Sequence, residues 1–384
     1  MKRKIKVALM SYTMDNRAAK GTALSTRRLV ERIVRDPDLD VTLIHYEKVD
    51  DPLYHEAREI TAPYLKLPLA TRFIRTMLLF WKCRKENFDI IHWFQPRLYP
   101  FFWLAPARHI VVTAHGAGDI TAPGQFPITR HIYNFIMIHF GFMIDAIIGV
   151  SDFGRSEIIE FYKARPERVH SLVHYNGGAE EFKPLDKRLA LQRIRGYGIS
   201  APYILDVSRL EPHKNVSSLV KAYAVLRDSH PERKEKLIIV GAPRYKSEET
   251  YALAEGSRYK DDIKFVHFIN QEDMNALYVA AELFVFPSLN EGFGMPLIES
   301  FASGTPVVTS NVTALPEVAG GAAILVDPTS VSALAGAMQQ ALVDNELRKT
   351  MIAKGLERAK DFTWDRSAEE IKKLYLAVVK MDTR

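Results

Sequence analysis

Cysteine is nearly absent from this sequence, since Cys83 is the single thiol among 384 residues. One thiol cannot form an internal disulfide, which excludes a disulfide-stapled scaffold and any structural zinc or iron–sulfur site built on cysteines. Glycine and proline are modest, at 20 residues each, too few for a collagenous or low-complexity chain. A chain of this length is expected to form two or three domains with their own apolar cores.

Long uninterrupted hydrophobic runs are also lacking. The apolar run near the N-terminus continues as a strand, so no signal peptide is predicted. The longest apolar stretch is 132–150, but Asn134, His139 and Asp145 interrupt it. A helix followed by a buried strand is the better interpretation, because charge inside a membrane is costly. We therefore expect a cytoplasmic protein without a membrane span.

Several catalytic and binding signatures are missing as well. The sequence has no Walker A motif, no Gly-x-Ser-x-Gly elbow and no three-glycine dinucleotide fingerprint, which disfavours a nicotinamide or flavin cofactor. It contains no cluster of His, Asp and Glu at metal-ligand spacing. It also lacks a zinc-ligand set and any run of five basic residues, so nucleic acid is not a predicted partner. We expect neither a cofactor nor a metal.

Charge is distributed unevenly along the chain. Residues 1–200 hold 30 Lys and Arg against 21 Asp and Glu (+9), whereas residues 201–384 hold 22 against 25 (−3). The segment 64–85 has six basic residues and no acidic one. Projected on a helix, one broad side of it carries Arg72, Arg75, Lys82 and Lys85, and aromatic side chains crowd the rest. Two interpretations stay open, a domain helix with a solvated basic face or contact with an anionic membrane surface.

Short strands rich in Val and Ile alternate with longer helical patterns along the whole chain. Because these strands are continuously apolar, they predict parallel sheets covered on both faces. The first series is Ile5–Ser11, Val41–Tyr46, Asp89–Phe94, His109–His115, Ala146–Ser151 and Val169–Tyr175. After a polar, turn-rich linker at 176–184, the second series is Tyr203–Ser208, Lys236–Gly241, Ile263–Phe268, Leu283–Pro287, Pro306–Ser310 and Ala323–Asp327. The fold class predicted is α/β, with two doubly wound, Rossmann-like domains and ligands beyond the carboxyl ends of the strands.

The segment 283–300 runs from a strand through a glycine-containing loop into a helix that opens near Met295. Gly292 and Gly294 allow the backbone to approach a ligand, and the amides of Phe293, Gly294 and Met295 then form an anion site.

Two glutamates accompany this loop. Glu299 is placed in the first helical turn, where a carboxylate either stabilises the helix dipole or accepts hydrogen bonds from ribose hydroxyls. Glu291 precedes the glycines and has no capping role, so it is either a solvated loop residue or a ligand contact.

Cations and a histidine follow other predicted strands. Arg209 ends one strand and Lys214 precedes the next helix, so this loop suits a diphosphate, although solvated surface is the alternative. His115 closes another strand and is either structural or directed at a ligand. Gly21 opens the first helix.

The residues from Glu291 to Glu299 resemble the E-x7-E signature of retaining GT-B glycosyltransferases, in particular glycosyltransferase family four. Further matching motifs are Thr113-Ala-His-Gly116, Gly149-Val-Ser151, Asn176-Gly177, Phe182-x-Pro184, Ser208-Arg209, Lys214-Asn215, Ser303-Gly-Thr-Pro306, Leu315-Pro-Glu-Val318 and Val326-Asp-Pro328. One departure lies at Lys20-Gly21, where the family usually shows two adjacent glycines.

The resemblance implies specific roles. Arg209 and Lys214 would hold the diphosphate of a nucleotide-sugar donor, Glu299 the ribose, Glu291 the transferred sugar, and His115 its reacting face. It implies two facing domains, with acceptor binding at 1–180, donor binding at 181–362 and a C-terminal helix at 363–384 that packs back toward the first domain.

The function expected is retaining, metal-independent hexosyl transfer, with mannosyl from GDP-mannose as the leading donor. The acceptor would be a glycan or lipid-linked glycan of the cell envelope, at the inner face of the cytoplasmic membrane. The alternatives are a UDP-sugar transferase with a soluble acceptor, an epimerase or phosphorylase, and a binder without turnover.

Overall fold

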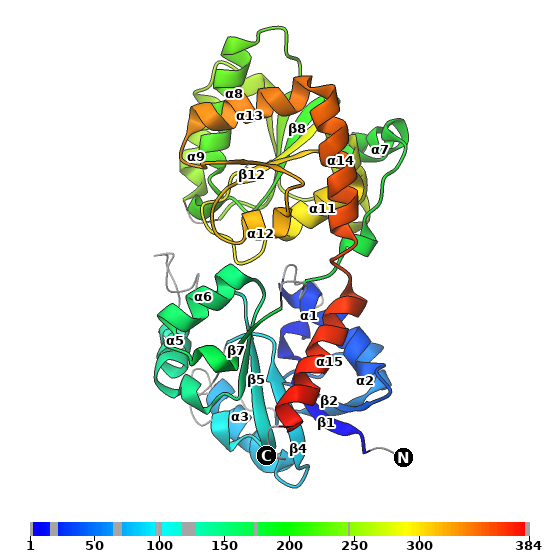
Figure 1. Ribbon diagram of the computed structural model, residues 1–384, viewed down its shortest axis with the longest axis vertical. Helices are drawn as coiled ribbons and strands as arrows, with labels where there is room; N and C mark the ends of the chain where they lie inside the picture. The colour runs from blue at the N-terminus through cyan, green and yellow to red at the C-terminus, as the bar shows by residue number, and fades with distance from the viewer. Residues whose placement is uncertain are drawn as a thin grey trace. The chain divides into compact units, whose positions relative to one another are not determined.

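The computed structural model describes residues 3–15, 22–63, 71–96, 98, 102–116, 128–172, 176–244 and 246–380. It divides into two compact units (Figure 1). Unit 1 comprises Met1–Gly177 and Trp364–Arg384, and unit 2 comprises Gly178–Thr363. Each unit contains one sheet whose strand pairs are all parallel, so the predicted α/β class with two parallel sheets is confirmed.

The sheet of unit 1 has the order β3-β2-β1-β4-β5-β6-β7. In that order its strands are Arg58–Thr61, Leu39–His45, Ile5–Met10, Phe88–Trp93, Ala107–Ala114, Ala146–Gly149 and Val169–Ser171. Its helices are α1 (Thr22–Val34), α2 (Leu53–Glu56), α3 (Thr71–Cys83), α5 (Ile128–Phe140), α6 (Asp152–Phe161) and α15 (Trp364–Lys380). The inner strands are buried along most of their length, as expected for a parallel sheet covered by helices on both faces, although β4 and β5 include polar residues such as Asp89 and His109.

The sheet of unit 2 has the order β10-β9-β8-β11-β12-β13. In that order its strands are Ile263–Val266, Lys236–Val240, Tyr203–Val207, Leu283–Phe286, Val307–Ser310 and Ile324–Val326. Its helices are α7 (Lys187–Ile194), α8 (Val216–Ser229), α9 (Ser247–Glu255), α10 (Met274–Ala280), α11 (Met295–Ser303), α12 (Leu315–Ala319), α13 (Val331–Val343) and α14 (Asn345–Ala359). A buried aliphatic core joins β8, β9 and β11 to α8 and α13.

Helix α15 follows unit 2 in the chain but packs on unit 1, against α1 and β4 (Figure 1). Its Tyr375 hydroxyl lies 2.6 Å from His92 Nδ1, and the other ring nitrogen of His92 lies 2.8 Å from Thr113 Oγ1. All three side chains are buried. Burial lowers the pKa of His92 to about 3, so the ring is neutral and can accept a hydrogen bond from one hydroxyl while donating a hydrogen bond to the other.

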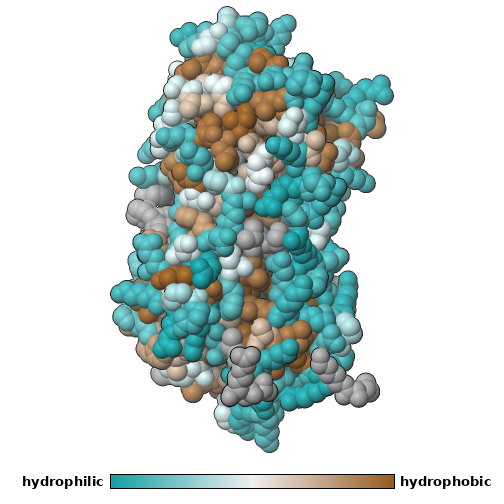
Figure 2. All heavy atoms as spheres, viewed as in Figure 1, coloured by the Kyte–Doolittle hydropathy of each residue, from teal (hydrophilic) through white to brown (hydrophobic). Residues whose placement is uncertain are grey.

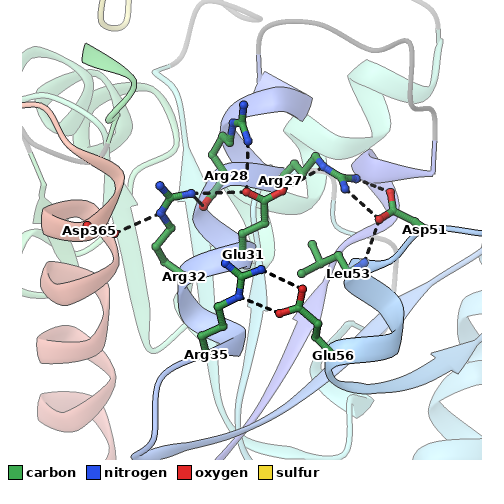
Figure 3. Close-up of polar contacts among 9 residues, drawn as sticks. All are labelled: Arg27, Arg28, Glu31, Arg32, Arg35, Asp51, Leu53, Glu56 and Asp365. Carbon is green, nitrogen blue, oxygen red and sulfur yellow. Dashed lines mark hydrogen bonds and ion pairs between the residues drawn. The ribbon is translucent and has the colours of Figure 1, made fainter. Parts of the chain in front are cut away.

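Helix α1 is held by an arginine network rather than by apolar contacts alone (Figure 3). Arg27 pairs with the buried carboxylate of Asp51, and Arg35 forms a two-pronged pair with Glu56. Arg32 reaches Asp365 at the start of α15, with 3.2 Å between nitrogen and oxygen. These three arginines are therefore paired with carboxylates of the same unit.

In the described part of the chain, no helix is long and apolar enough to span a membrane. On the face shown in Figure 2, hydrophilic residues cover most of the surface, and smaller hydrophobic patches interrupt it. Exposed large apolar side chains of unit 1 include Trp81, Leu104, Phe135 and Phe142.

Candidate functional site

The strand order of unit 2 reverses between β8 and β11, which are neighbours at the centre of the sheet. In open parallel sheets, ligands bind beyond the carboxyl ends of the strands at such a switch point. The loop after β8 carries Arg209 and Lys214, and the loop after β11 carries Glu291 and the glycines. The topology therefore brings together the two loops that the sequence singled out separately.

Asn215 fastens these two loops to each other. It adopts a left-handed conformation (φ 57°) between a short 3-10 turn, Pro212–Lys214, and helix α8. Its buried side-chain amide donates to the carbonyl of Pro287 at 3.0 Å and to that of Pro328 at 2.8 Å. Because Lys214 directly precedes this anchor, its backbone is fixed beside the end of β11.

Lys214 and Glu291 form a close ion pair. Nζ of Lys214 lies 2.5 Å from Oε1 of Glu291, and both side chains are only 12% exposed. The ammonium also lies over the ring of Phe286, 5.6 Å from its centroid. Arg209, on the same loop as Lys214, is 60% exposed and meets only the carboxylate of Glu211, at 3.6 Å, among the described residues. The structure thus joins Lys214 with Glu291 and leaves the Arg209 guanidinium open to solvent.

The glycine loop reaches helix α11 through Gly294, which has φ 105° and precedes the first helical residue, Met295. A side chain at Gly294 would place Cβ 2.8 Å from a methyl of Leu315, so both conformation and space favour glycine. The amides of Phe293, Gly294 and Met295 have no protein acceptor in the part of the chain described. An anion site at these amides stays a prediction.

The side chain of Phe293 belongs to the core rather than to a binding surface. It is 5% exposed and packs edge-on against Phe362, with ring centroids 5.6 Å apart. Only the backbone of Phe293 can therefore contact a ligand in this structure.

The expectation that Glu299 lies in the first turn of its helix is wrong. Glu299 is the fifth residue of α11, one position beyond that turn. Its carboxylate accepts a hydrogen bond from the hydroxyl of Tyr278 at 2.7 Å, so Tyr278, on α10, positions it. Burial raises the pKa of Glu299 to about 7, against the opposing effect of the Tyr278 hydrogen bond. Glu299 therefore does not stabilise the helix dipole from the first turn. Its carboxyl group is half-buried, and one of its oxygens is held by Tyr278.

Asp206 is a site residue that the sequence analysis missed. It lies in β8, is fully buried, and accepts a hydrogen bond from Ser208 Oγ to Oδ2 at 2.6 Å. Its Oδ1 has no partner among the described residues. Burial raises the pKa of Asp206 to about 7, while the charge of Lys214 lowers it. An acid within an otherwise apolar strand, two residues before Ser208, was the signal available.

His115 belongs to unit 1, where it follows the last residue of β5. Burial lowers its pKa to about 4, although a hydrogen bond to the backbone of Phe94 acts in the other direction. The imidazole is therefore neutral at physiological pH. The next residue, Gly116, has φ 108° and turns the chain away from the strand. Gly21, predicted to contact the donor, lies outside the described residues.

The predicted basic face of α3 needs correction. Arg75 is buried (6% exposed), donating to Glu47 at 2.7 Å, to the carbonyl of Pro63 at 2.9 Å and to the carbonyl of Tyr46. It is a structural tie between α3 and the segment after β2, and it is unavailable to a membrane. Lys82 is exposed and donates to the carbonyl of Thr61 at 3.2 Å.

The other two residues of the predicted basic face are Lys85 and Arg72. Lys85 is exposed beyond the end of α3. The side chain of Arg72 lies outside the described part.

No group of three or more His, Cys, Asp or Glu side chains that could hold a metal ion occurs among the described residues.

Comparisons with known proteins agree with this architecture. Residues 196–358 match the family model described as glycosyl transferases group 1, and residues 19–177 match the model of glycosyltransferase family 4. O-antigen chain mannosyltransferase B of Escherichia coli is 33% identical over 270 residues, which cover 69% of this chain and 70% of that protein. The chain belongs to glycosyltransferase family 4.

Two further likenesses bear on the fold and on the breadth of the family. D-inositol 3-phosphate glycosyltransferase of Corynebacterium glutamicum is 33% identical over 57% of this chain, which spans 54% of that relative's length. The structure of Anabaena Alr3699/HepE in complex with UDP and glucose superposes with a TM-score of 0.75 at 17% identity, covering 97% of this chain and all of that one. At that identity the likeness shows the fold, which is GT-B.

Proposed function

We propose that this protein transfers a mannosyl group from GDP-mannose, with retention of configuration and without a metal, to a glycan or lipid-linked glycan of the cell envelope. The observation that carries the proposal is the grouping, at the switch point of unit 2, of Lys214, Glu291 and the amides of residues 293–295, which have no acceptor in the part of the chain described. The name of the Escherichia coli relative supports a mannosyl group and an envelope glycan.

The chemistry follows from where charge develops. As the bond between the sugar C1 and the phosphate oxygen breaks, negative charge grows on the diphosphate and the sugar becomes oxocarbenium-like. This negative charge on the diphosphate would be stabilised by Arg209, Lys214 and the amides of residues 293–295. Such electrostatic stabilisation is usually the largest single contribution to catalysis. Glu291 and Glu299 offer carboxylate oxygens to sugar and ribose hydroxyls respectively.

Retention is best explained by substitution on one face of the sugar. The acceptor oxygen bonds to C1 on the side that the diphosphate leaves, and the acceptor proton passes to a diphosphate oxygen. In the proposed reaction Glu291 accepts hydrogen bonds from sugar hydroxyls, so it acts as a contact to the sugar rather than as a nucleophile. The neutral imidazole of His115 would present a hydrogen-bonding group to the sugar without adding positive charge beside the oxocarbenium.

A panel of nucleotides and nucleotide sugars tests the donor. Purified protein is melted with GDP, UDP, GDP-mannose and UDP-glucose, and transfer is then followed by mass spectrometry of glycan and lipid-linked acceptors. We expect the largest stabilisation from GDP-mannose. Stabilisation by UDP compounds alone would select the UDP-sugar alternative, and isomerised donor or phosphate-dependent release of sugar phosphate would identify an epimerase or phosphorylase.

Metal independence has its own test. EDTA should leave transfer largely intact, because protein cations and amides supply the positive charge. Loss of transfer in EDTA that a divalent ion restores would contradict this part of the proposal.

We also propose that unit 1 contacts the anionic inner face of the cytoplasmic membrane through the end of α3. Trp81 is 64% exposed, and Arg84 stacks on its ring at 4.1 Å, beside the exposed Lys82 and Lys85. Each basic side chain near an anionic bilayer contributes about 1 kcal/mol. The buried Arg75 contributes nothing to this surface.

Liposome co-sedimentation tests the membrane contact. Anionic vesicles should capture the protein at low salt, and neutral vesicles should not. A variant in which Lys82, Arg84 and Lys85 are all replaced by Gln should stay in solution with either kind of vesicle. The matched control replaces the exposed Lys349 and Lys360 of unit 2 by Gln and should sediment like the wild type. A wild-type protein that ignores anionic vesicles at low salt would favour a soluble acceptor.

A further inference from the structure

The two cations of the loop after β8 are in different states. Arg209 is 60% exposed and 3.6 Å from Glu211, whereas Lys214 is 12% exposed and 2.5 Å from Glu291. One cation can therefore meet an incoming anion at once. The other is already neutralised by a carboxylate of the same site.

This ion pair conflicts with the roles of its members in the proposed reaction. A diphosphate needs the Lys214 ammonium as a point charge, and a sugar needs the Glu291 carboxylate as a hydrogen-bond acceptor. The pair occupies one of the three ammonium donors and one carboxylate oxygen, so each role competes with it. Full contact of Lys214 with the diphosphate and of Glu291 with the sugar therefore favours opening the pair.

We propose that Lys214 exchanges partners during each turnover, passing from Glu291 to the diphosphate when the donor binds and returning when the sugar has left. This inference rests on the proposed function, because it names how that same site is gated. In the loaded site, sugar hydroxyls replace the ammonium as donors to Glu291. In the product complex no sugar is present, and Glu291 competes again for Lys214.

The structure supplies a fixed frame for such an exchange. Asn215 holds the backbone next to Lys214 through its two carbonyl contacts, and the amide of Glu291 donates to Thr313 Oγ1 at 3.3 Å. The ring of Phe286 offers its face to the ammonium, 5.6 Å away. The side chains of Lys214 and Glu291 can therefore part while their backbones keep their places.

The exchange has a consequence for affinity. A nucleoside diphosphate without its sugar takes Lys214 and leaves Glu291 as a half-buried, unpaired carboxylate, which is unfavourable. The intact nucleotide sugar avoids this cost, because its hydroxyls reach Glu291. The pair therefore weakens binding of the product and aids its release.

Titration calorimetry with GDP and UDP tests the exchange. Glu291→Gln keeps the shape of the side chain but removes its charge, so the nucleoside diphosphate that binds the wild type should bind this variant on the order of tenfold more tightly. Glu211→Gln, which neutralises the partner of Arg209, is the matched control and should change the affinity by less than about twofold. Circular dichroism confirms that each variant is folded.

A second background isolates Lys214. In Lys214→Met the substitution Glu291→Gln should no longer tighten binding, because the cation that it frees is absent. If Glu291→Gln, with Lys214 present, binds the nucleoside diphosphate no more tightly than the wild type does, the partner exchange is wrong and the proposed function is unaffected. Absence of binding by either nucleotide to the wild type overturns the proposed function, and the exchange with it.

Discussion

Acidification should affect the stabilities of the two units in opposite directions. Unit 1 contains His92, fully buried with its pKa lowered by burial from 6.5 to about 3. Unit 2 contains Asp206, fully buried with its pKa raised by burial from 3.8 to about 7. Both groups are neutral in the folded protein at mildly acidic pH, but their unfolded forms are charged over different ranges.

The sign of each effect follows from proton counting. Between pH 6.5 and 3 the unfolded state binds a proton at His92 that the folded state does not, so unit 1 loses stability as the pH falls. Between pH 7 and 3.8 the folded state binds a proton at Asp206 that the unfolded state does not, so unit 2 gains stability as the pH falls. His115 and Glu299 act in the same directions within their respective units.

The magnitude is large enough to measure. Each group changes the free energy of unfolding by about 1.4 kcal/mol per pH unit within its range, so a step from pH 6.5 to 5.0 changes it by about 2 kcal/mol per group. Each unit has two such groups, so its total change is about 4 kcal/mol. For domains of this size, that corresponds to a melting temperature about 8–16 °C lower for unit 1 and about as much higher for unit 2.

Tryptophan fluorescence can follow unit 1 by itself. The four tryptophans of the chain are Trp81, Trp93, Trp103 and Trp364, and every one belongs to unit 1. Hydrogen-exchange mass spectrometry on peptides from β8 and β11 reports the opening of unit 2. Asp206→Asn is the control variant, because it should remove about half of the pH dependence of unit 2, leaving the part due to Glu299, and should leave the fluorescence transition of unit 1 unchanged.

Two results would refute this reasoning. A shift of both units in the same direction between pH 6.5 and 5.0 would mean that other groups dominate proton binding. A pH slope of unit 2 that is undiminished in Asp206→Asn would remove Asp206 as one of its causes.

Three substitutions test single contacts. Tyr278→Phe removes the hydroxyl that holds Glu299 and should weaken donor binding by about 1.5–3 kcal/mol with less change in turnover at saturating donor, measured by steady-state kinetics; an unchanged KM would argue against this positioning role. Gly294→Ala should unfold unit 2 more readily, by about 1–3 kcal/mol in urea titrations, because φ is 105° and Cβ would lie 2.8 Å from a leucine methyl; an unaltered midpoint would show that the loop yields. Tyr375→Phe leaves a nitrogen of buried His92 without its hydroxyl partner and should cost about 1–3 kcal/mol in the fluorescence transition of unit 1.

The sequence predicted the sheets well because the buried strands are rich in Val and Ile and end in recognisable loops. Strand β3, Arg58–Thr61, was missed, since its four residues include only one apolar side chain, the buried Ile60. It is an edge strand, where hydrogen bonds to β2 rather than burial on both faces define the element. Periodicity carries no signal for such a strand.

Side-chain roles were harder to predict where they depend on distant backbone. Arg75 has the helical spacing of a solvated basic face, but its side chain is buried. It donates hydrogen bonds to the carbonyls of Tyr46 and Pro63 and to the carboxylate of Glu47. Spacing along one helix cannot reveal acceptors contributed by another segment. In the same way, the motifs identified Glu299 but not Tyr278, whose contact depends on how two helices pack.

The return of α15 to unit 1 makes unit 2 an insertion within the other unit's chain. During synthesis, the ribosome must make Gly178–Thr363 before α15 emerges, which takes about 10–40 s at 5–20 residues per second. For that interval β4 lacks the helix that supplies a partner to His92, while every segment of unit 2 becomes available in turn. Unit 1 therefore cannot complete its packing until the whole of unit 2 has been synthesised.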